Sequence, residues 1–137
     1  MNIYRHNQPF ELERGGILPE LTIAFSTYGK LNAAHDNVIW VCHALTADSD
    51  VASWWPHTGP LHVNPATGRP YYKDFPELTI RDMVRAHRLL ADILGIHRIH
   101  TLVGSSVGGF QAVEWAVQEP ERIGKLVLIA TAAKAIR

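Results

Sequence analysis

The stretch GSSVG, residues 104–108, constrains this chain more than any other feature of its sequence. An apolar run typical of a strand precedes it, and a helix-like segment follows it. This context matches the pattern G-x-S-x-G, in which a serine lies on a very tight strand-to-helix turn. Side chains two residues before or after the serine would clash with the strand and helix backbones, so glycine is needed there. The pattern predicts that Ser106 has a strained backbone and a hydroxyl above the sheet edge.

In this register Ser106 is the candidate nucleophile, and Ser105 is a variable position. The N-terminus of the following helix favours developing negative charge, which makes the Val107 N–H a candidate oxyanion donor. The second donor is expected from the loop after an earlier strand, where the Leu45 N–H is the candidate. A phosphate-binding turn and a plain structural turn are the alternatives. No P-loop lysine follows the turn, and GSSVGG does not fit G-x-G-x-x-G, so the nucleophile is favoured.

Composition excludes several classes of protein. The 137 residues are enough for one domain, and the formal net charge of zero gives no electrostatic footprint for nucleic acid or anionic membrane. The N-terminal segment has no apolar signal core, and no run approaches the roughly 18 apolar residues of a membrane span. Cys42, the single cysteine, lies in an apolar run and suits a reducing compartment. We therefore expect a cytoplasmic protein that binds neither membranes nor nucleic acids.

Hydrophobic periodicity predicts an α/β chain. Residues 10–14 and 21–25 alternate like two strands of an antiparallel pair, and residues 32–37 form a polar turn. Continuous apolar runs at 37–42, 99–103 and 126–130 predict buried parallel strands. A capped helix is predicted at 79–94, where Thr79 and Asp82 form a T-x-x-D pattern, and a second one at about 108–118, where Pro120 stops it. Residues 47–78 have no clear periodicity, which is unusual for a loop in a compact domain.

Four segments together resemble the homoserine O-acetyltransferase branch of the α/β-hydrolase fold. They are TYGKLNAAHDNVIWVCHALTAD (27–48), TGPLHVNPATGRPYYKDFPELTIRDMVRAH (58–87), LVGSSVGGFQAVEWAVQEPERI (102–123) and IATAA (129–133). The resemblance implies a partial α/β-hydrolase fold: a mostly parallel sheet with an antiparallel N-terminal pair and helices on both faces. It places the whole chain, 1–137, in the N-terminal part of one such domain, without the C-terminal part and the lid.

The resemblance implies an acyltransferase of methionine biosynthesis. Members move an acetyl group from acetyl-CoA, a co-substrate, to the hydroxyl of L-homoserine through a serine acyl-enzyme. Ser106 aligns with the family nucleophile, and Leu45 and Val107 align with its oxyanion amides. No metal and no permanently bound cofactor are implied, and full-length members are expected to form homodimers. A homoserine or serine O-succinyltransferase and an esterase of the same fold are the alternatives.

The catalytic partners of Ser106 are missing from this sequence. In this fold the acid and the histidine base follow the serine along the chain, but only Glu114, Glu119 and Glu121 follow Ser106 as acidic residues, and no histidine does. Among the upstream histidines, His43 is expected to shape the oxyanion loop and His87 to be packed. Arg81, Arg85 and Arg88 are expected to be solvated, with contact to the phosphates of CoA as the alternative. We expect little or no turnover by this chain alone.

The chain also departs from the family between His57 and Thr58. Family members carry a further strand and a glycine-containing loop there, whereas this sequence joins the flanking segments directly. An internal deletion near 57–58 would remove that strand from the sheet and explain the irregular stretch at 47–78. A non-catalytic remnant is therefore the hypothesis that competes with an enzyme.

Overall fold

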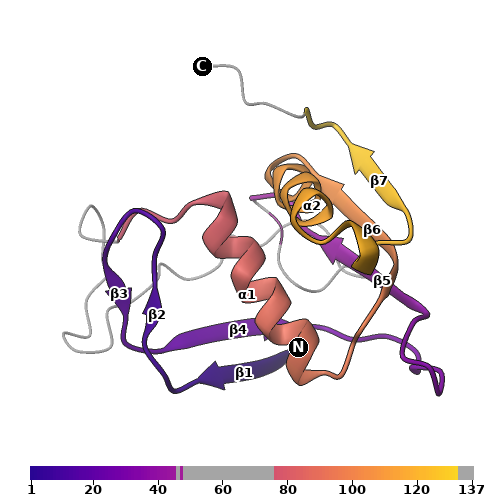
Figure 1. Ribbon diagram of the computed structural model, residues 1–137, viewed down its shortest axis with the longest axis horizontal. Helices are drawn as coiled ribbons and strands as arrows, with labels where there is room; N and C mark the ends of the chain where they lie inside the picture. Colours follow the sequence, from indigo (N-terminus) through magenta and orange to yellow (C-terminus); the bar gives the residue numbers. More distant parts are fainter. Residues whose placement is uncertain (46, 48–75, 133–137) are drawn as a thin grey trace.

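The computed structural model describes residues 1–45, 47 and 76–132 (Figure 1). The elements in these ranges are, in chain order, β1 (Asn2–His6), β2 (Phe10–Glu11), β3 (Ile17–Leu18), β4 (Leu21–Phe25), β5 (Val38–Cys42), α1 (Ile80–Ile93), β6 (Ile99–Ser105), α2 (Val107–Gln118), a short 3-10 turn (Pro120–Arg122) and β7 (Leu126–Ile129). Trp54, Trp55 and the predicted junction at 57–58 lie outside the described residues. No helix in the described ranges has both the length and the apolar character needed to cross a bilayer.

Three of the described strands form a parallel sheet, which carries the glycine–serine turn. Its strand order is β5-β6-β7, and its three strands are the ones that the apolar runs predicted. Cys42 of β5 is opposite Gly104 of β6, and Ser105 of β6 is opposite Ile129 of β7. Because the carboxyl ends of parallel strands meet at one edge, the loop after β5, the glycine–serine turn and the segment after β7 share that edge.

The N-terminal strands pair differently from the prediction. The sequence pattern paired residues 10–14 with 21–25, but β4 pairs with β1, a strand that the pattern did not predict. Residues 10–11 instead pair with residues 17–18 in the short hairpin β2–β3. The strand ends there because Leu12 bends into a turn, accepting a hydrogen bond from Gly15 N–H and donating one to Gly16 O, while Glu13 N–H donates to Asp82. Alternation alone cannot distinguish a long strand from a short hairpin followed by a turn.

Helix α1 begins and ends as its sequence predicts. Thr79 caps it with its side chain on the amide of Asp82, and the Asp82 carboxylate accepts from the Thr79 amide, which completes a capping box. At the other end Gly95 has φ +66°, the left-handed conformation that glycine adopts readily. These two local signals fix the helix at both ends.

The core lies between the parallel sheet and the two helices. Val84 and Ala91 of α1 and Ala112 and Trp115 of α2 join one buried cluster with residues of β5 and β6. Trp115 is fully buried and meets Trp40 of β5 edge to face, with ring centroids 5.3 Å apart. The two helices thus share one core, and the described ranges contain no helix outside it.

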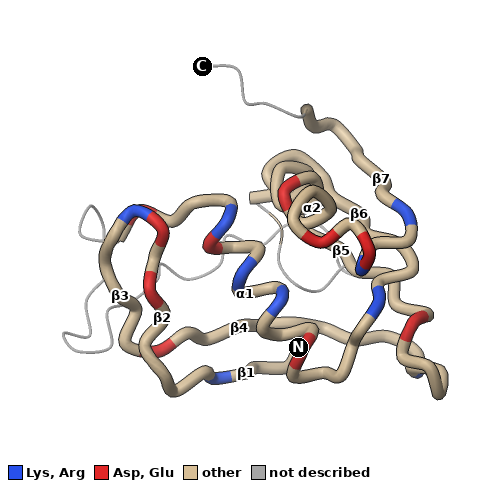
Figure 2. Tube along the Cα trace, in the orientation of Figure 1, with Lys and Arg blue, Asp and Glu red and all other residues tan. Residues whose placement is uncertain are grey.

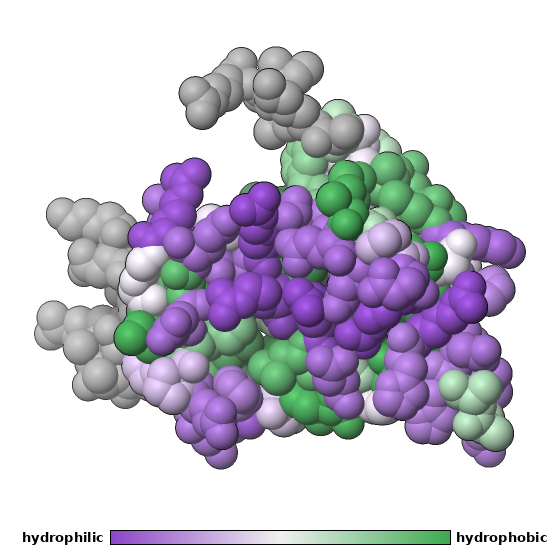
Figure 3. Space-filling model, in the orientation of Figure 1, coloured by the Kyte–Doolittle hydropathy of each residue, from purple (hydrophilic) through white to green (hydrophobic). Residues whose placement is uncertain are grey.

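Strand β7 is not buried, contrary to the sequence prediction. All four of its residues are between 40% and 51% exposed, and apolar surface gathers over it at the upper right of Figure 3. The reason is that β6 is the only strand paired with β7 in the described part of the chain, so its outer edge has no strand neighbour there. An apolar run therefore predicted the strand correctly but not its environment.

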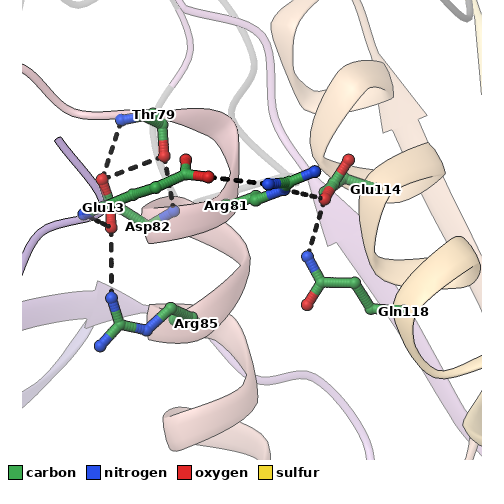
Figure 4. Close-up of polar contacts among 7 residues, drawn as sticks. All are labelled: Glu13, Thr79, Arg81, Asp82, Arg85, Glu114 and Gln118. Carbon is green, nitrogen blue, oxygen red and sulfur yellow. Dashed lines mark hydrogen bonds and ion pairs between the residues drawn. The ribbon is translucent and has the colours of Figure 1, made fainter.

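Charged side chains tie the layers together across their surface. Positive and negative residues are interspersed along α1 and its neighbours in Figure 2. Arg81 of α1 reaches both Glu13 and Glu114, at 2.8 Å each, and so links the N-terminal segment to α2 (Figure 4). Below it, Asp82 is 1% exposed and accepts hydrogen bonds from the backbone of Thr79 and Glu13. One turn of α1 thus joins three segments.

Candidate active site

The glycine–serine turn has the conformation expected for an exposed nucleophile. Strand β6 ends at Ser105 and α2 begins at Val107, so Ser106 alone makes the turn. Its backbone has φ 52° and ψ −120°, outside the regions that L-residues ordinarily occupy. Such strain persists only where surrounding contacts impose it, and it is typical of functional sites. The strained backbone predicted from the sequence is therefore present, while the role of Ser106 as nucleophile stays a prediction.

The glycines around Ser106 are required by close packing. A Cβ on Gly108 would fall onto the carbonyl of Cys42, and one on Gly104 would lie 2.7 Å from Cα of Gly109. Real Cβ atoms do not come this close to backbone. The glycines thus let the first turn of α2 pack directly against the ends of β5 and β6, which is the physical reason the motif predicted.

The backbone of Ser106 is also held from β7. Its amide donates to the carbonyl of Ile129 at 3.1 Å. Its carbonyl accepts two hydrogen bonds, one from the Gly109 amide at 2.9 Å and one from the Thr131 hydroxyl at 2.9 Å. Sequence analysis did not single out Thr131, although it lies inside the quoted IATAA segment.

The two candidate oxyanion donors lie on elements that touch. Val107 N–H opens α2, where the first amides of a helix have no partner within the helix. Leu45 lies three residues after Cys42, whose carbonyl packs against Gly108. Around Leu45 the loop turns through a hydrogen bond of 3.0 Å from the Ala47 N–H to the Ala44 carbonyl, and Leu45 is 80% exposed. The fold therefore brings the loop and the helix N-terminus to the same sheet edge.

No side chain in the described ranges hydrogen-bonds to the Ser106 hydroxyl. His43, in the loop after β5, has its Nδ1 2.8 Å from the carbonyl of Ala44, so it shapes the loop as expected. Glu114 is engaged by Arg81 and Gln118. Neither of these two side chains is hydrogen-bonded to Ser106 as a general base would be.

His87 is packed rather than placed at the turn. Its ring stacks on Trp115 with an interplanar angle of 10°, and its Nε2 is 2.7 Å from Oε1 of Gln111. Burial lowers the pKa of His87 below its usual value, although the bond to Gln111 opposes this. The nearby Cys42 thiol is fully buried, and desolvation raises its pKa to about 12, as is typical of a cysteine that packs in a core.

The three arginines of α1 are occupied by protein groups. Arg81 pairs with Glu13 and Glu114, while Arg85 donates to the Glu11 carbonyl and lies 4.7 Å from the ring centre of Phe10. Arg88 pairs with Glu119 at 2.9 Å. The three side chains are 61%, 42% and 38% exposed, so the expectation that they are solvated is confirmed, and the α1–α2 contact and the N-terminal segment also supply acceptors for them.

The comparisons with known proteins decide the family. A family model described as the alpha/beta hydrolase fold matches residues 47–137, about two thirds of the chain. This chain belongs to the alpha/beta hydrolase fold family. The predicted fold class is confirmed in its parallel sheet, its antiparallel N-terminal pair and its two helices, although in the described residues both helices pack into one buried cluster rather than covering both faces of the sheet.

Similar proteins are named as acyltransferases and esterases. The chain is 43% identical to a homoserine O-acetyltransferase of Chlorobaculum tepidum, over 90% of this chain and 42% of that protein. It is 36% identical to a homoserine O-succinyltransferase of a Nocardioides species, over 93% of this chain and 44% of that protein. The crystal structure of an esterase superposes with a TM-score of 0.82 at 25% identity, covering 97% of this chain and 48% of the other.

The chain spans less than half the length of the curated relatives that it matches. The Chlorobaculum match also runs over 151 positions, whereas 90% of this 137-residue chain supplies only about 123 of them. The relative therefore carries additional residues inside the matched region.

Two hollows in the described part of this alpha/beta hydrolase chain lie away from its turn. One, of about 470 Å³, lies between the N-terminal segment and α1 and is lined by residues such as Phe10, Arg85 and Asp92. The other, of about 290 Å³, lies at the opposite end of the strands, beside His100 and Lys125. The described residues also contain no cluster of three metal-ligating side chains. The candidate site thus rests on the turn and its packing.

Proposed function

We propose that this chain carries the nucleophile and the oxyanion hole of a homoserine O-acyltransferase. The observation that carries the proposal is the strained Ser106 between β6 and α2, in a chain 43% identical to a named homoserine O-acetyltransferase. Ser106 is the proposed nucleophile, and the N–H groups of Leu45 and Val107 are the proposed oxyanion donors. The packing of Gly108 against Cys42 supports this pairing, since it joins the two donor segments.

The proposed reaction has two acyl transfers. In the first, Ser106 Oγ attacks the thioester carbonyl of acetyl-CoA, a C–O bond forms, the C–S bond breaks, and CoA leaves as the thiol after a general base passes on the serine proton. In the second, the hydroxyl of L-homoserine attacks the acyl-serine, the bond to Ser106 breaks, and Oγ regains a proton. Both steps pass through an oxyanion that the two amides stabilise.

Acetyl-CoA and L-homoserine are the proposed substrates. The acetyl donor is supported by the name and identity of the Chlorobaculum relative, and the succinyl alternative by the Nocardioides relative at lower identity. Both names share homoserine as the acceptor, so the acceptor is supported more broadly than the donor. Serine stays the alternative acceptor.

The general base is proposed to lie outside this sequence. No Asp or His follows Ser106, and none of the described histidines contacts its hydroxyl. We therefore propose little or no turnover by the chain alone, with slow acylation of Ser106. The additional residues of the Chlorobaculum relative inside the matched region support an internal deletion, whose position near 57–58 stays a prediction. A non-catalytic remnant is the competing proposal.

Intact-mass analysis after incubation with acetyl-CoA tests the proposal. We expect one acetyl group on the wild-type chain and on Ser105→Ala, none on Ser106→Ala, and no multiple-turnover CoA release when L-homoserine is added. Acetylation that survives in Ser106→Ala would contradict the proposed nucleophile. CoA release that depends on both homoserine and Ser106 would contradict the proposed inactivity, and a chain that is never acylated would be a remnant. Repeating the experiment with succinyl-CoA compares the donors.

An esterase is the second candidate, because an esterase structure superposes at a TM-score of 0.82. Continuous hydrolysis of p-nitrophenyl acetate, with a rate that homoserine does not change, would favour it.

With the first function we also propose a cytoplasmic location, no permanently bound cofactor and a homodimeric full-length protein. The single, buried Cys42 supports the location.

A further inference from the structure

The peptide group between Ser106 and Val107 contains both an acceptor and the candidate oxyanion donor. Its carbonyl belongs to Ser106 and its N–H to Val107. A trans peptide is a rigid plane in which the C=O and the N–H point in opposite directions. Whatever fixes the direction of the Ser106 carbonyl therefore also fixes the direction of the Val107 N–H.

Two groups hold this carbonyl, and they come from different elements. The Gly109 amide, at 2.9 Å, belongs to the same turn of α2 and moves with it. The Thr131 hydroxyl, also at 2.9 Å, comes from the segment after β7. The Ser106 N–H also donates to the carbonyl of Ile129, the last residue of β7. The turn is therefore held from the β7 side by two hydrogen bonds, one at its amide and one at its carbonyl.

The path of the chain after β7 places Thr131 over the turn. Ala130 has φ 48°, a left-handed conformation that is uncommon for a residue with a side chain. After this bend, the Thr131 side chain fills the space where a Cβ on Gly109 would lie. Thr131 thus makes two kinds of contact at the turn: packing on Gly109 and a hydrogen bond to the Ser106 carbonyl.

We propose that Thr131 is a positioning residue of the oxyanion hole, whose hydroxyl orients the Ser106–Val107 peptide so that the Val107 N–H faces the reacting carbonyl. This inference rests on the proposed function, in which an acyl group is transferred to Ser106. The hydroxyl acts only through the peptide and touches neither the acyl donor nor the acceptor. Its effect is expected on the rate of acylation rather than on the binding of the donor.

Two conservative variants separate the hydroxyl from the packing. Thr131→Val keeps the shape and removes the hydrogen bond, while Thr131→Ser keeps the hydroxyl and removes the methyl group. Thr22→Val makes the same chemical change at an exposed position of β4, a strand distant in sequence from the turn, and serves as the matched control. Urea unfolding of all three variants measures how much of any effect comes from stability.

The first measurement is the rate of Ser106 acylation by p-nitrophenyl acetate, followed by release of p-nitrophenolate. Loss of one neutral hydrogen bond predicts a roughly tenfold lower maximal rate for Thr131→Val, with unchanged half-saturation. Thr131→Ser and Thr22→Val are expected within about twofold of the wild type on the same scale. A maximal acylation rate of Thr131→Val equal to that of the wild type overturns the proposal. So does an equally large loss of rate in Thr131→Ser when its stability is unchanged.

A second measurement keeps the positioning role testable if Ser106 is never acylated. In that case the proposed function fails, and NMR of the labelled chain reports the turn directly. We expect Thr131→Val to change the Ser106 Cα shift, the Ser106 amide–Hα coupling and the Val107 amide shift, and Thr131→Ser to preserve them. Unchanged signals in Thr131→Val would overturn the positioning role independently of any activity.

Discussion

At the scale of single residues, the turn is a place where strain and close packing meet. Ser106 adopts φ 52° because Gly104 and Gly108 let strand and helix approach without side chains between them. Neither glycine has a positive φ, so the requirement for glycine at these positions is steric rather than conformational. Substitutions there should therefore act through overlap with the neighbouring backbone.

Gly108→Ala is expected to destabilise the chain and to displace the turn. The new methyl group would fall onto the carbonyl of Cys42, and such overpacking costs about 1–3 kcal/mol or more. Urea unfolding followed by circular dichroism measures the loss. Val117→Ala, on an exposed position of the same helix, should change the free energy of unfolding much less. Equal stability of Gly108→Ala and wild type would show that β5 and α2 are not in contact.

At the scale of elements, α1 acts as the connection between the N-terminal segment and the core. Its first turn contains Asp82, which caps the helix and also accepts from the Glu13 amide and from Arg85. Burial alone would raise the pKa of Asp82, but the hydrogen bonds from Thr79 and Glu13 and the charge of Arg85 outweigh it, so the pKa lies below its usual 3.8. The ionised carboxylate therefore stabilises the folded state.

Acid is expected to remove this contribution of Asp82. Because its folded pKa is depressed, the stabilisation is complete above the unfolded value of 3.8 and is lost as the pH falls through the folded pKa. Asp82→Asn should cost about 1–3 kcal/mol at pH 7. It should also show a weaker fall in unfolding free energy between pH 5 and pH 2.5. Parallel pH profiles for the two proteins would contradict the assignment.

Sequence patterns predicted the fold and the turn correctly where contacts between neighbouring residues determine the structure. The capping box, the left-handed Gly95 and the tight turn at Ser106 depend on residues a few positions apart, and all three are present. The partner of β4 and the exposure of β7 depend on contacts between distant segments, and both predictions were wrong. Thr131 escaped notice for the same reason, since its acceptor lies 25 residues earlier.

At the scale of the whole molecule, two features favour self-association: the apolar surface over β7 and the formal net charge of zero. The strand exposes Leu126, Val127, Leu128 and Ile129, and it carries no charge or proline that would discourage edge-to-edge pairing. A chain without net charge also lacks the repulsion that keeps copies apart. Self-association through this strand is the expected consequence in solution.

A lysine on β7 should reduce this self-association. Val127→Lys is expected to lower the light scattering of concentrated solutions at pH 7 while leaving the unfolding free energy nearly unchanged, because the side chain is already 42% exposed. Thr22→Lys adds the same charge on β4 and controls for the change in net charge. If both variants reduce scattering equally, overall charge rather than the surface of β7 governs association.

The double role of Asp82 also implies an order of events during folding. Its bonds to Thr79 span three residues, whereas its bond to the Glu13 amide closes a loop of 69 residues. The short-range cap costs little chain entropy and can form as soon as the helix nucleates, but the long loop can close only onto a carboxylate that is already held in place. We therefore expect the N-terminal segment to dock late and mutations in it to speed unfolding more than they slow folding.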